Sequence, residues 1–336
     1  MYGSSTQYKF WTFKDESELN LMRTQANKDF IRKYGAQYEI PEDERKGYFL
    51  TAKQELLLVR FYENSLSDFC RKFRDPRDQR IRMPLNVSST AQHYFKRFYL
   101  YNSVMDYHPK EILVTCVYLA CKIEEFYVTI NDFVFNVKGD KRKAAEIILN
   151  NELQLTQELQ FHLIIHHPYR PIEGLLIDIK TRFPELTDPE RLRPFIEEFV
   201  VKVQLTDAIL LYSPSQIALA AVTTAVSKLQ ENLDRYVTDI LFNDNPEQMV
   251  VLIEAVRKIK KIVKSYDYTP LADPLRKKIE EKLEVCRNQQ NNPNSKQYRA
   301  NYTEWDDDDD LMVKQSVDIN DSNYLGVEKL RSPASY

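Results

Sequence analysis

Glycine is scarce in this chain, with six residues in 336, at positions 3, 35, 47, 139, 174 and 326. No two of them lie at the spacing of a phosphate-binding loop, which needs glycines so that backbone N–H groups can approach a phosphate. A nucleotide-binding loop of the usual kind is therefore excluded. Because glycine weakens the interior of helices, its scarcity also suits a chain built mainly of helices.

Cysteine is also rare, and its pattern contains no CxxC pair. The four residues, Cys70, Cys116, Cys121 and Cys286, are typical of reduced, buried thiols in an intracellular protein. His162 and His166 lie four apart in "HLIIHHP", but no cysteine or acidic ligand of suitable spacing joins them. We therefore expect neither a metal site nor a cofactor.

Neither sign of charge is in large excess: 47 basic and 50 acidic residues give a formal net charge of −3. This balance argues against non-specific nucleic-acid binding as the main activity. The first twenty residues lack the basic start and apolar core of a signal peptide, and no apolar run is long enough to cross a bilayer. Clustered Ser/His/Asp or Cys/His arrangements that would indicate an enzyme are also missing from the sequence.

Helix signals, in contrast, recur from residue 51 to about 290. The capping boxes "TAKQ" at 51–54 and "SPSQ" at 213–216 are both followed by apolar residues with a period of 3.6. Strand alternation is nearly absent, so we predict an all-α protein. The predicted helices are 51–73, 88–101, 109–126, 129–136, 143–162, 171–183, 189–211, 214–229, 232–242 and 246–266, with a further N-terminal helix at 15–34 and a C-terminal helix at 273–287.

The ten central helices fall into two sets of five with similar lengths and order. The third helices of the two sets align, "HPKEILVTCVYLACK" over "SPSQIALAAVTTAVS", and both are apolar on all sides. This pattern predicts two tandem five-helix bundles joined by the linker "HPYRP". The predicted domains are an N-terminal arm with a helix (1–50), the first bundle (51–165), the second bundle (166–268), a C-terminal helix (269–290) and a disordered acidic tail (291–336).

Lys122 ends the most apolar helix, "EILVTCVYLACKIEEF". A helix that is apolar on every side is buried on every side, so this lysine must reach the surface or meet an opposite charge. From the residues alone, an ordinary, partly exposed ion pair remains an alternative to a functional role.

Two tandem bundles with such a lysine resemble the cyclin family. Cyclins carry a lysine at the end of helix 3 of the first box and a glutamate in helix 5 about thirty positions later. These would be Lys122 in "LACKIEEF" and Glu152 in "NNELQLTQELQFHL". The strings "HYFKRFYLYNSVMDYHPKEILVTCVYLACKIEEF", "HHPYRPIEGLLIDIKTRFP" and "EWDDDDDL" are similar to the cyclin H branch of that family, and the resemblance covers about residues 1–310.

The resemblance implies two cyclin boxes, with the N- and C-terminal helices lying against the first, in a non-catalytic regulatory subunit that binds and activates cyclin-dependent kinase 7. In this role Lys122 and Glu152, with apolar surface from Ile123, Phe126 and Leu163, would bind the backbone of the kinase's αC region. It further implies a RING-type assembly factor as third subunit, the core of transcription factor II H as a partner, and a nuclear location. The substrates would be other cyclin-dependent kinases and the C-terminal domain of RNA polymerase II.

The sequence departs from the family in two places. The segment 74–87 is longer than the usual connection between the first two helices of the box, which leaves its conformation open. Helix 51–73 lacks the Met-Arg-…-Trp signature with which cell-cycle cyclins build a substrate-docking patch, so we do not expect docking there.

The main alternative is a DNA-binding cyclin-fold protein of the transcription factor IIB type. That class predicts a basic core and usually a zinc ribbon ahead of it, whereas this chain has a net charge of −3 and no cysteine before Cys70. The basic segment "RKIKKIVK" at 257–264 is more simply the solvated face of an amphipathic helix, and the aspartates at 306–310 a solubilising tail. Ser332 in "RSPAS" fits a proline-directed phosphorylation site.

Overall fold

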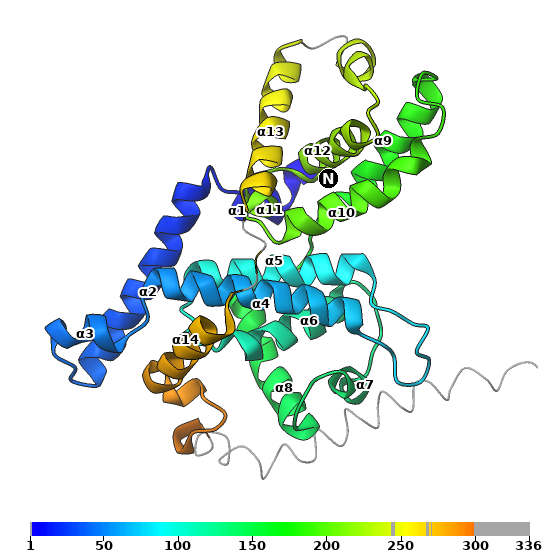
Figure 1. Ribbon diagram of the computed structural model, residues 1–336. Coiled ribbons are helices and arrows are strands. Elements are labelled where there is room, and N and C mark those ends of the chain that lie inside the picture. Colours follow the sequence, from blue (N-terminus) through cyan, green and yellow to red (C-terminus); the bar gives the residue numbers. More distant parts are fainter. Residues whose placement is uncertain (1, 243–245, 267–268, 270, 299–336) are drawn as a thin grey trace, which may run out of the picture. The chain divides into compact units, whose positions relative to one another are not determined.

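The computed structural model describes residues 2–242, 246–266, 269 and 271–298, and in these residues every regular element is helical (Figure 1). The all-α prediction is therefore confirmed. By internal contacts the chain divides into two units, Met1–Cys286 and Arg287–Tyr336. In the second unit a short 3-10 turn, Gln289–Asn291, begins where the Asn288 side chain accepts a hydrogen bond from the backbone of Gln290.

The first bundle is built around one central helix. This helix, α6, begins at Pro109, whose missing N–H costs nothing at a helix start, and His108 caps it by accepting a hydrogen bond from the backbone N–H of Lys110. It packs against α4, α5 and α8. The helices of this bundle are α4 (Ala52–Lys72), α5 (Leu85–Tyr101), α6 (Pro109–Ile123), α7 (Ile130–Phe135) and α8 (Lys141–Glu158).

The second bundle repeats this plan around α12, which begins with the predicted capping box of Ser213 and Gln216. This central helix packs against α9, α10 and α13. Both α6 and α12 bury residues on every side, as their aligned sequences predicted. The elements of the second bundle are α9 (Tyr169–Arg182), η2 (Pro189–Leu192), α10 (Arg193–Gln204), α11 (Ala208–Leu211), α12 (Pro214–Lys228), the π-helical η3 (Tyr236–Leu241) and α13 (Pro246–Ser265).

The single helix predicted for 189–211 is wrong, because the chain forms η2, α10 and α11 there. The break after Gln204 has a local cause: Thr206 Oγ1 donates to the carbonyl of Val203 and accepts from the backbone N–H of Ala208. Such side-chain bonds compete with the helical ladder. The helix predicted for 143–162 likewise stops at Glu158, and Gln160 and Phe161 follow it with φ of 54° and 57°.

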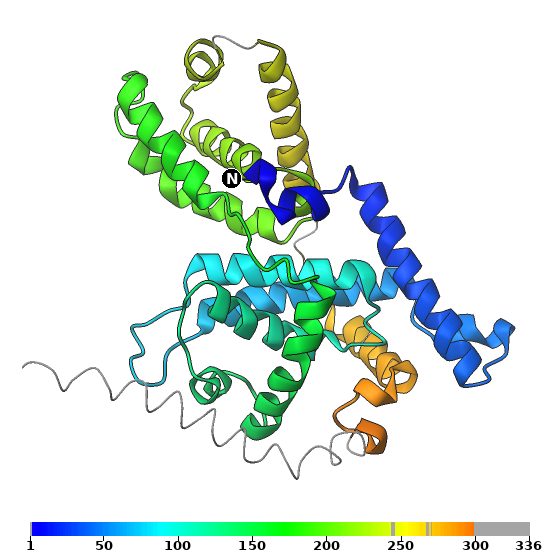
Figure 2. The same ribbon diagram turned by 180° about the vertical axis from the view of Figure 1, so that it is seen from behind.

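Both terminal helices of the first unit lie against the first bundle, as the resemblance implied. The N-terminal helix α2 (Glu16–Gln37) packs against α4 and α5, and α14 (Asp273–Cys286) packs against α4. The short helices α1 (Thr6–Phe10) and α3 (Glu42–Tyr48) and the 3-10 turn η1 (Tyr2–Ser4) were not predicted. Figure 2 shows α1 beside the second bundle, where the backbone N–H of Phe13 donates to the carbonyl of Leu210 in α11.

The long connection between α4 and α5 is anchored to the end of α7. Arg74 and Asn136 exchange two hydrogen bonds: the backbone N–H of Arg74 donates to Asn136 Oδ1 (3.0 Å), and Asn136 Nδ2 donates to the Arg74 carbonyl (2.9 Å). Asp75 is buried and accepts from the backbone N–H of Arg77 at 2.8 Å. These contacts define the conformation that the sequence left open.

The residue limits of the predicted domains stay a prediction. Residues 299–336, which include the aspartates at 306–310 and the candidate phosphorylation site Ser332, lie outside the described residues. In the part of the chain that is described, no helix is long and apolar enough to span a membrane.

Candidate functional site

Lys122 and Glu152, the two residues that the family resemblance singled out, form an ion pair. Lys122 Nζ lies 2.6 Å from Glu152 Oε1 and 2.8 Å from Oε2, so the ammonium donates to both oxygens of one carboxylate. The two side chains come from the last turn of α6 and the middle of α8, which pack against each other. The Lys122 side chain remains 47% exposed and that of Glu152 20%. The Lys122 side chain therefore extends from the end of the apolar helix to the surface, where it lies beside its partner charge.

The three apolar residues predicted beside this pair are half-buried and pack against the core of the first bundle. Ile123 follows Lys122 directly, and the Phe126 ring lies 5.9 Å from that of Phe73 in an edge-to-face contact. The Leu163 carbonyl accepts a hydrogen bond from the Tyr94 hydroxyl at 2.5 Å. The structure thus holds all three in fixed positions but leaves each only part of its side chain for a partner.

Several other apolar side chains that lie near this pair in sequence are more exposed than these three, and sequence reasoning did not identify them. On α8, Leu149 lies one turn before Glu152 on the same face and is 41% exposed, and Leu153 is 63% exposed. Residues 147–149 are all apolar, but a helix cannot turn three consecutive side chains toward one core. The sequence alone therefore indicated that an apolar side chain is exposed here, and Leu149 is one. The other exposed residues are Tyr127, Phe161 and Ile164.

A second polar cluster lies where the first bundle meets the linker and the second bundle, along α5. Gln204 Nε2 donates to Ser89 Oγ at 2.5 Å and to the Tyr169 hydroxyl at 2.8 Å. Thr90 Oγ1 donates to Glu124 Oε1 at 2.6 Å. Burial acts to raise the pKa of Glu124, but hydrogen bonds from His167 and Thr90 outweigh it and lower that pKa. This face of α5 is therefore polar and buried, and it joins the two bundles.

Further along α5, charged side chains also connect the two bundles. Lys96 Nζ lies 2.8 Å from Glu63 Oε1 and donates to the Leu205 carbonyl at 3.3 Å. Arg23 of α2 makes a bidentate pair with Asp207, with N–O distances of 2.7 and 2.8 Å. Burial opposes ionisation of Asp207, but Arg23 and then Lys96 lower its pKa. A polar cavity of about 220 Å³ lies over these groups.

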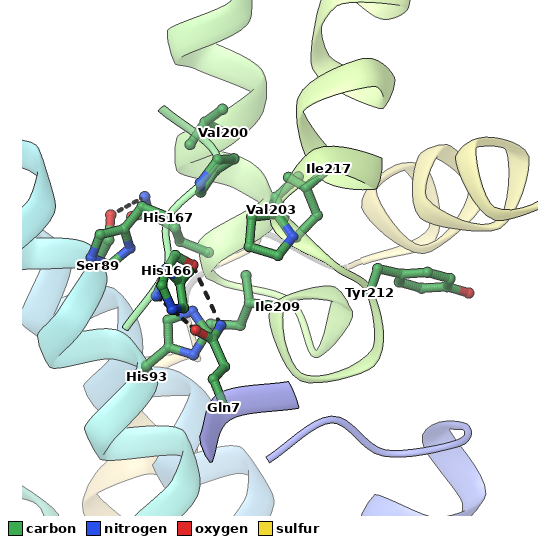
Figure 3. Close-up of a pocket in the computed structure, with 13 residues that line it drawn as sticks. Gln7, Ser89, His93, His166, His167, Val200, Val203, Ile209, Tyr212 and Ile217 are labelled. Carbon is green, nitrogen blue, oxygen red and sulfur yellow. Dashed lines mark hydrogen bonds between the residues drawn. The ribbon is translucent and has the colours of Figure 1, made fainter. Parts of the chain in front are cut away.

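A smaller cavity near α1 is shown in Figure 3, where Gln7 points toward His166 beside His93. Gln7 Oε1 accepts from the backbone N–H of His166 at 2.6 Å, and its Nε2 donates to the His166 carbonyl at 3.4 Å. The cavity has a volume of about 10 Å³, the space of one water molecule, so it cannot take a substrate.

The histidines that raised the question of a metal have other roles. His162 Nδ1 accepts a hydrogen bond from Trp11 Nε1–H at 3.0 Å, and the His162 ring stacks on Phe10. Within the described ranges, no group of three or more His, Cys, Asp and Glu side chains is arranged to hold a metal ion.

Family models match both bundles. The cyclin N-terminal domain matches residues 79–164, and the cyclin C-terminal domain matches residues 167–264. The chain is 45% identical to cyclin-H of Xenopus laevis over 273 residues, which cover 80% of this chain and 81% of the relative.

Two solved structures are also similar to this chain. A chain of the yeast TFIIK complex of Kin28, Ccl1 and Tfb3 is 26% identical, with a TM-score of 0.59, over 78% of this chain and 100% of that one. A chain of the CAK complex of Chaetomium thermophilum has a TM-score of 0.71 at 24% identity, over 100% of this chain and 98% of that one, and shows the same fold. The matches to the two family models and to the Xenopus relative show that this chain belongs to the cyclin family, in its cyclin H branch.

Proposed function

We propose that this chain is the regulatory subunit of cyclin-dependent kinase 7, which it binds through the surface around Lys122 and Glu152. The observation that carries this proposal is the pair itself: a lysine and a glutamate held on two packed helices, 2.6 Å apart and partly open to solvent. Membership of the cyclin H branch favours this function over DNA binding of the transcription factor IIB type.

The pair is suited to backbone groups of a partner. An ammonium has three donors and a carboxylate about four acceptor sites. Two of the Lys122 donors go to Glu152, and no further hydrogen-bond partner of Lys122 is found among the described residues. One N–H and several carboxylate lone pairs therefore remain for carbonyl and N–H groups at the end of a kinase helix.

Apolar side chains would supply buried area next to this polar centre. We propose Ile123, Phe126 and Leu163 as kinase contacts, and add Leu149 and Leu153, which expose more surface. Apolar residues that exclude water from a central contact are typical of strong interfaces between proteins.

Such a contact would activate the kinase by selecting a conformation. A protein kinase works only when its β3 lysine pairs with the αC glutamate and its magnesium-binding aspartate is in place. A cyclin that binds αC better in the inward position shifts the kinase toward that state by its difference in affinity. No catalytic group of the cyclin is required.

The relatives support a wider assembly. The yeast complex that contains a similar chain has three proteins, which supports a third subunit, and we propose that it is a RING-type assembly factor. The complex would join the core of transcription factor II H and act in the nucleus. Its substrates would be other cyclin-dependent kinases and the RNA polymerase II C-terminal domain.

The test is the affinity of purified cyclin-dependent kinase 7 for the wild-type chain, Lys122→Ala, Glu152→Ala and the double variant. Each single change should cost roughly 2–5 kcal/mol of binding, and the double variant much less than their sum. Lys228→Ala is a matched control, because Lys228 ends α12 and pairs with Glu198 at 2.7 Å in the second bundle. Equal effects of Lys122→Ala and Lys228→Ala would refute the proposed surface.

A further inference from the structure

The aromatic ring of Tyr118 lies directly beside the Lys122 ammonium. Tyr118 precedes Lys122 by four residues on α6, so both side chains occupy one face of the helix. Lys122 Nζ lies 4.8 Å from the centroid of the Tyr118 ring. This distance is within the range of a cation–π interaction, in which the negative face of the ring attracts the cation.

The ring is itself held in place. Tyr118 is 7% exposed, and its ring makes an edge-to-face contact with Phe133, which is completely buried, at a centroid distance of 5.2 Å. The Tyr118 hydroxyl has no hydrogen-bond partner among the residues that the structure describes. The contribution of Tyr118 at this surface therefore comes from the ring and not from the hydroxyl.

Lys122 needs such a support because its ammonium is carried on a flexible four-carbon chain. A freely rotating lysine loses side-chain entropy when a partner fixes it, and that loss weakens binding. Glu152 holds the ammonium from α8 and Tyr118 holds it from α6, so the charge is bounded by two rigid helices. The lysine is thus ordered before any partner arrives.

We propose that Tyr118 is a positioning residue, whose ring holds the Lys122 ammonium against Glu152 in the orientation that a kinase backbone carbonyl requires. This proposal rests on the proposed function, because it assumes that Lys122 contacts the kinase. Tyr118 acts through Lys122 and needs no contact of its own with the kinase.

The experiment compares Tyr118→Phe, which keeps the ring, with Tyr118→Leu, which removes it, in wild-type and Lys122→Ala backgrounds. We expect Tyr118→Leu to weaken the affinity for cyclin-dependent kinase 7 roughly three- to tenfold, and Tyr118→Phe to leave it unchanged. In the Lys122→Ala background Tyr118→Leu should have no further effect. Phe195→Leu is the matched control, since the Phe195 ring lies under Lys228, with Nζ 5.6 Å from its centroid.

A second measurement tests the positioning without the kinase. Protons above an aromatic ring face resonate upfield in NMR spectra, so the Lys122 ε-methylene protons of the free chain should be shifted upfield. The shift should persist in Tyr118→Phe and disappear in Tyr118→Leu. If the shift is absent in the wild type, or if Tyr118→Leu weakens kinase binding equally with and without Lys122, the positioning role is overturned. If the NMR result holds but Lys122→Ala binds the kinase normally, it is the proposed function that fails, together with any effect of Tyr118 on it.

Discussion

Lys96 of α5 and Glu63 of α4 form an ion pair at 2.8 Å with side chains that are only 1% and 3% exposed. Burial removes both charges from water, a cost that only good geometry and further hydrogen bonds can offset. Lys96 also donates to the Leu205 carbonyl of the second bundle, and its Nζ lies 3.9 Å from Asp207 Oδ1. The pair thus connects both bundles through one lysine.

Removing one member of this pair should destabilise the protein strongly. Lys96→Met leaves Glu63 buried without its partner, and we expect a loss of roughly 3–5 kcal/mol in the free energy of unfolding. The double variant Lys96→Met/Glu63→Leu should lose less than Lys96→Met alone. Urea denaturation measures both values. Arg142→Met serves as control, because Arg142 is 91% exposed in its pair with Glu146 and should change stability by less than about 1 kcal/mol. A small effect of Lys96→Met would contradict the prediction.

Trp11 should hold the N-terminal segment onto the first bundle. It is 1% exposed, its Nε1–H donates to His162 Nδ1, and the Arg97 guanidinium lies 4.9 Å from the centroid of its ring. Trp11→Ala should therefore cost roughly 3–5 kcal/mol of stability, measured by thermal and urea unfolding. The neighbouring Phe10 is 54% exposed, so Phe10→Ala should cost much less. A loss for Trp11→Ala as small as that for Phe10→Ala would show that the burial of Trp11 contributes little.

Glu55 should make the stability depend on pH. Burial raises the pKa of Glu55 from its usual 4.5 to about 7, although Ser103 Oγ donates a hydrogen bond to it at 2.5 Å. Between these two pKa values the folded chain holds a proton that the unfolded chain has released. The free energy of unfolding should consequently fall as the pH rises from about 4.5 to about 7, by roughly 3 kcal/mol from this group.

The measurement for Glu55 is urea denaturation at pH 5 and pH 8 of the wild type and Glu55→Gln. The glutamine keeps the size of the side chain and cannot ionise, so the stability difference between wild type and variant should shift in favour of the variant at pH 8. A difference that is the same at both pH values would exclude Glu55 as the titrating group.

Thr51 should stabilise the start of α4 through its capping box. Its hydroxyl accepts from the backbone N–H of Gln54 at 3.3 Å, and Gln54 Oε1 accepts from the backbone N–H of Thr51 at 3.0 Å. Thr51→Ala removes one of these bonds and should cost about 1 kcal/mol, measured by thermal unfolding. Thr51→Ser keeps the hydroxyl and should behave as wild type. If serine and alanine destabilise equally, the cap is not the cause.

Local signals in the sequence determined the helical class, most helix starts and the central helices of both bundles. A capping box or a proline at the first helical position acts over three or four residues, so "TAKQ" and "SPSQ" indicate where α4 and α12 begin without knowledge of their surroundings. The apolar run around α6 likewise showed that Lys122 had to leave the core, and the family resemblance gave its partner Glu152.

Only the tertiary structure decided which polar residues are buried. On α5, the residues from Ser89 to Arg97 contain enough polar side chains to suggest an exposed face, yet they are buried in the joint with the linker and the second bundle. Their partners come from other segments of the chain, and Gln204, which donates to Ser89, lies 115 residues away in sequence. Periodicity reports which face of a helix is apolar, but it contains no information on pairs between distant segments. The contact between Tyr118 and Lys122 depends on both levels. The sequence shows that the two residues are four apart on one helix, but only the packing of the Tyr118 ring against Phe133 fixes the geometry of the contact.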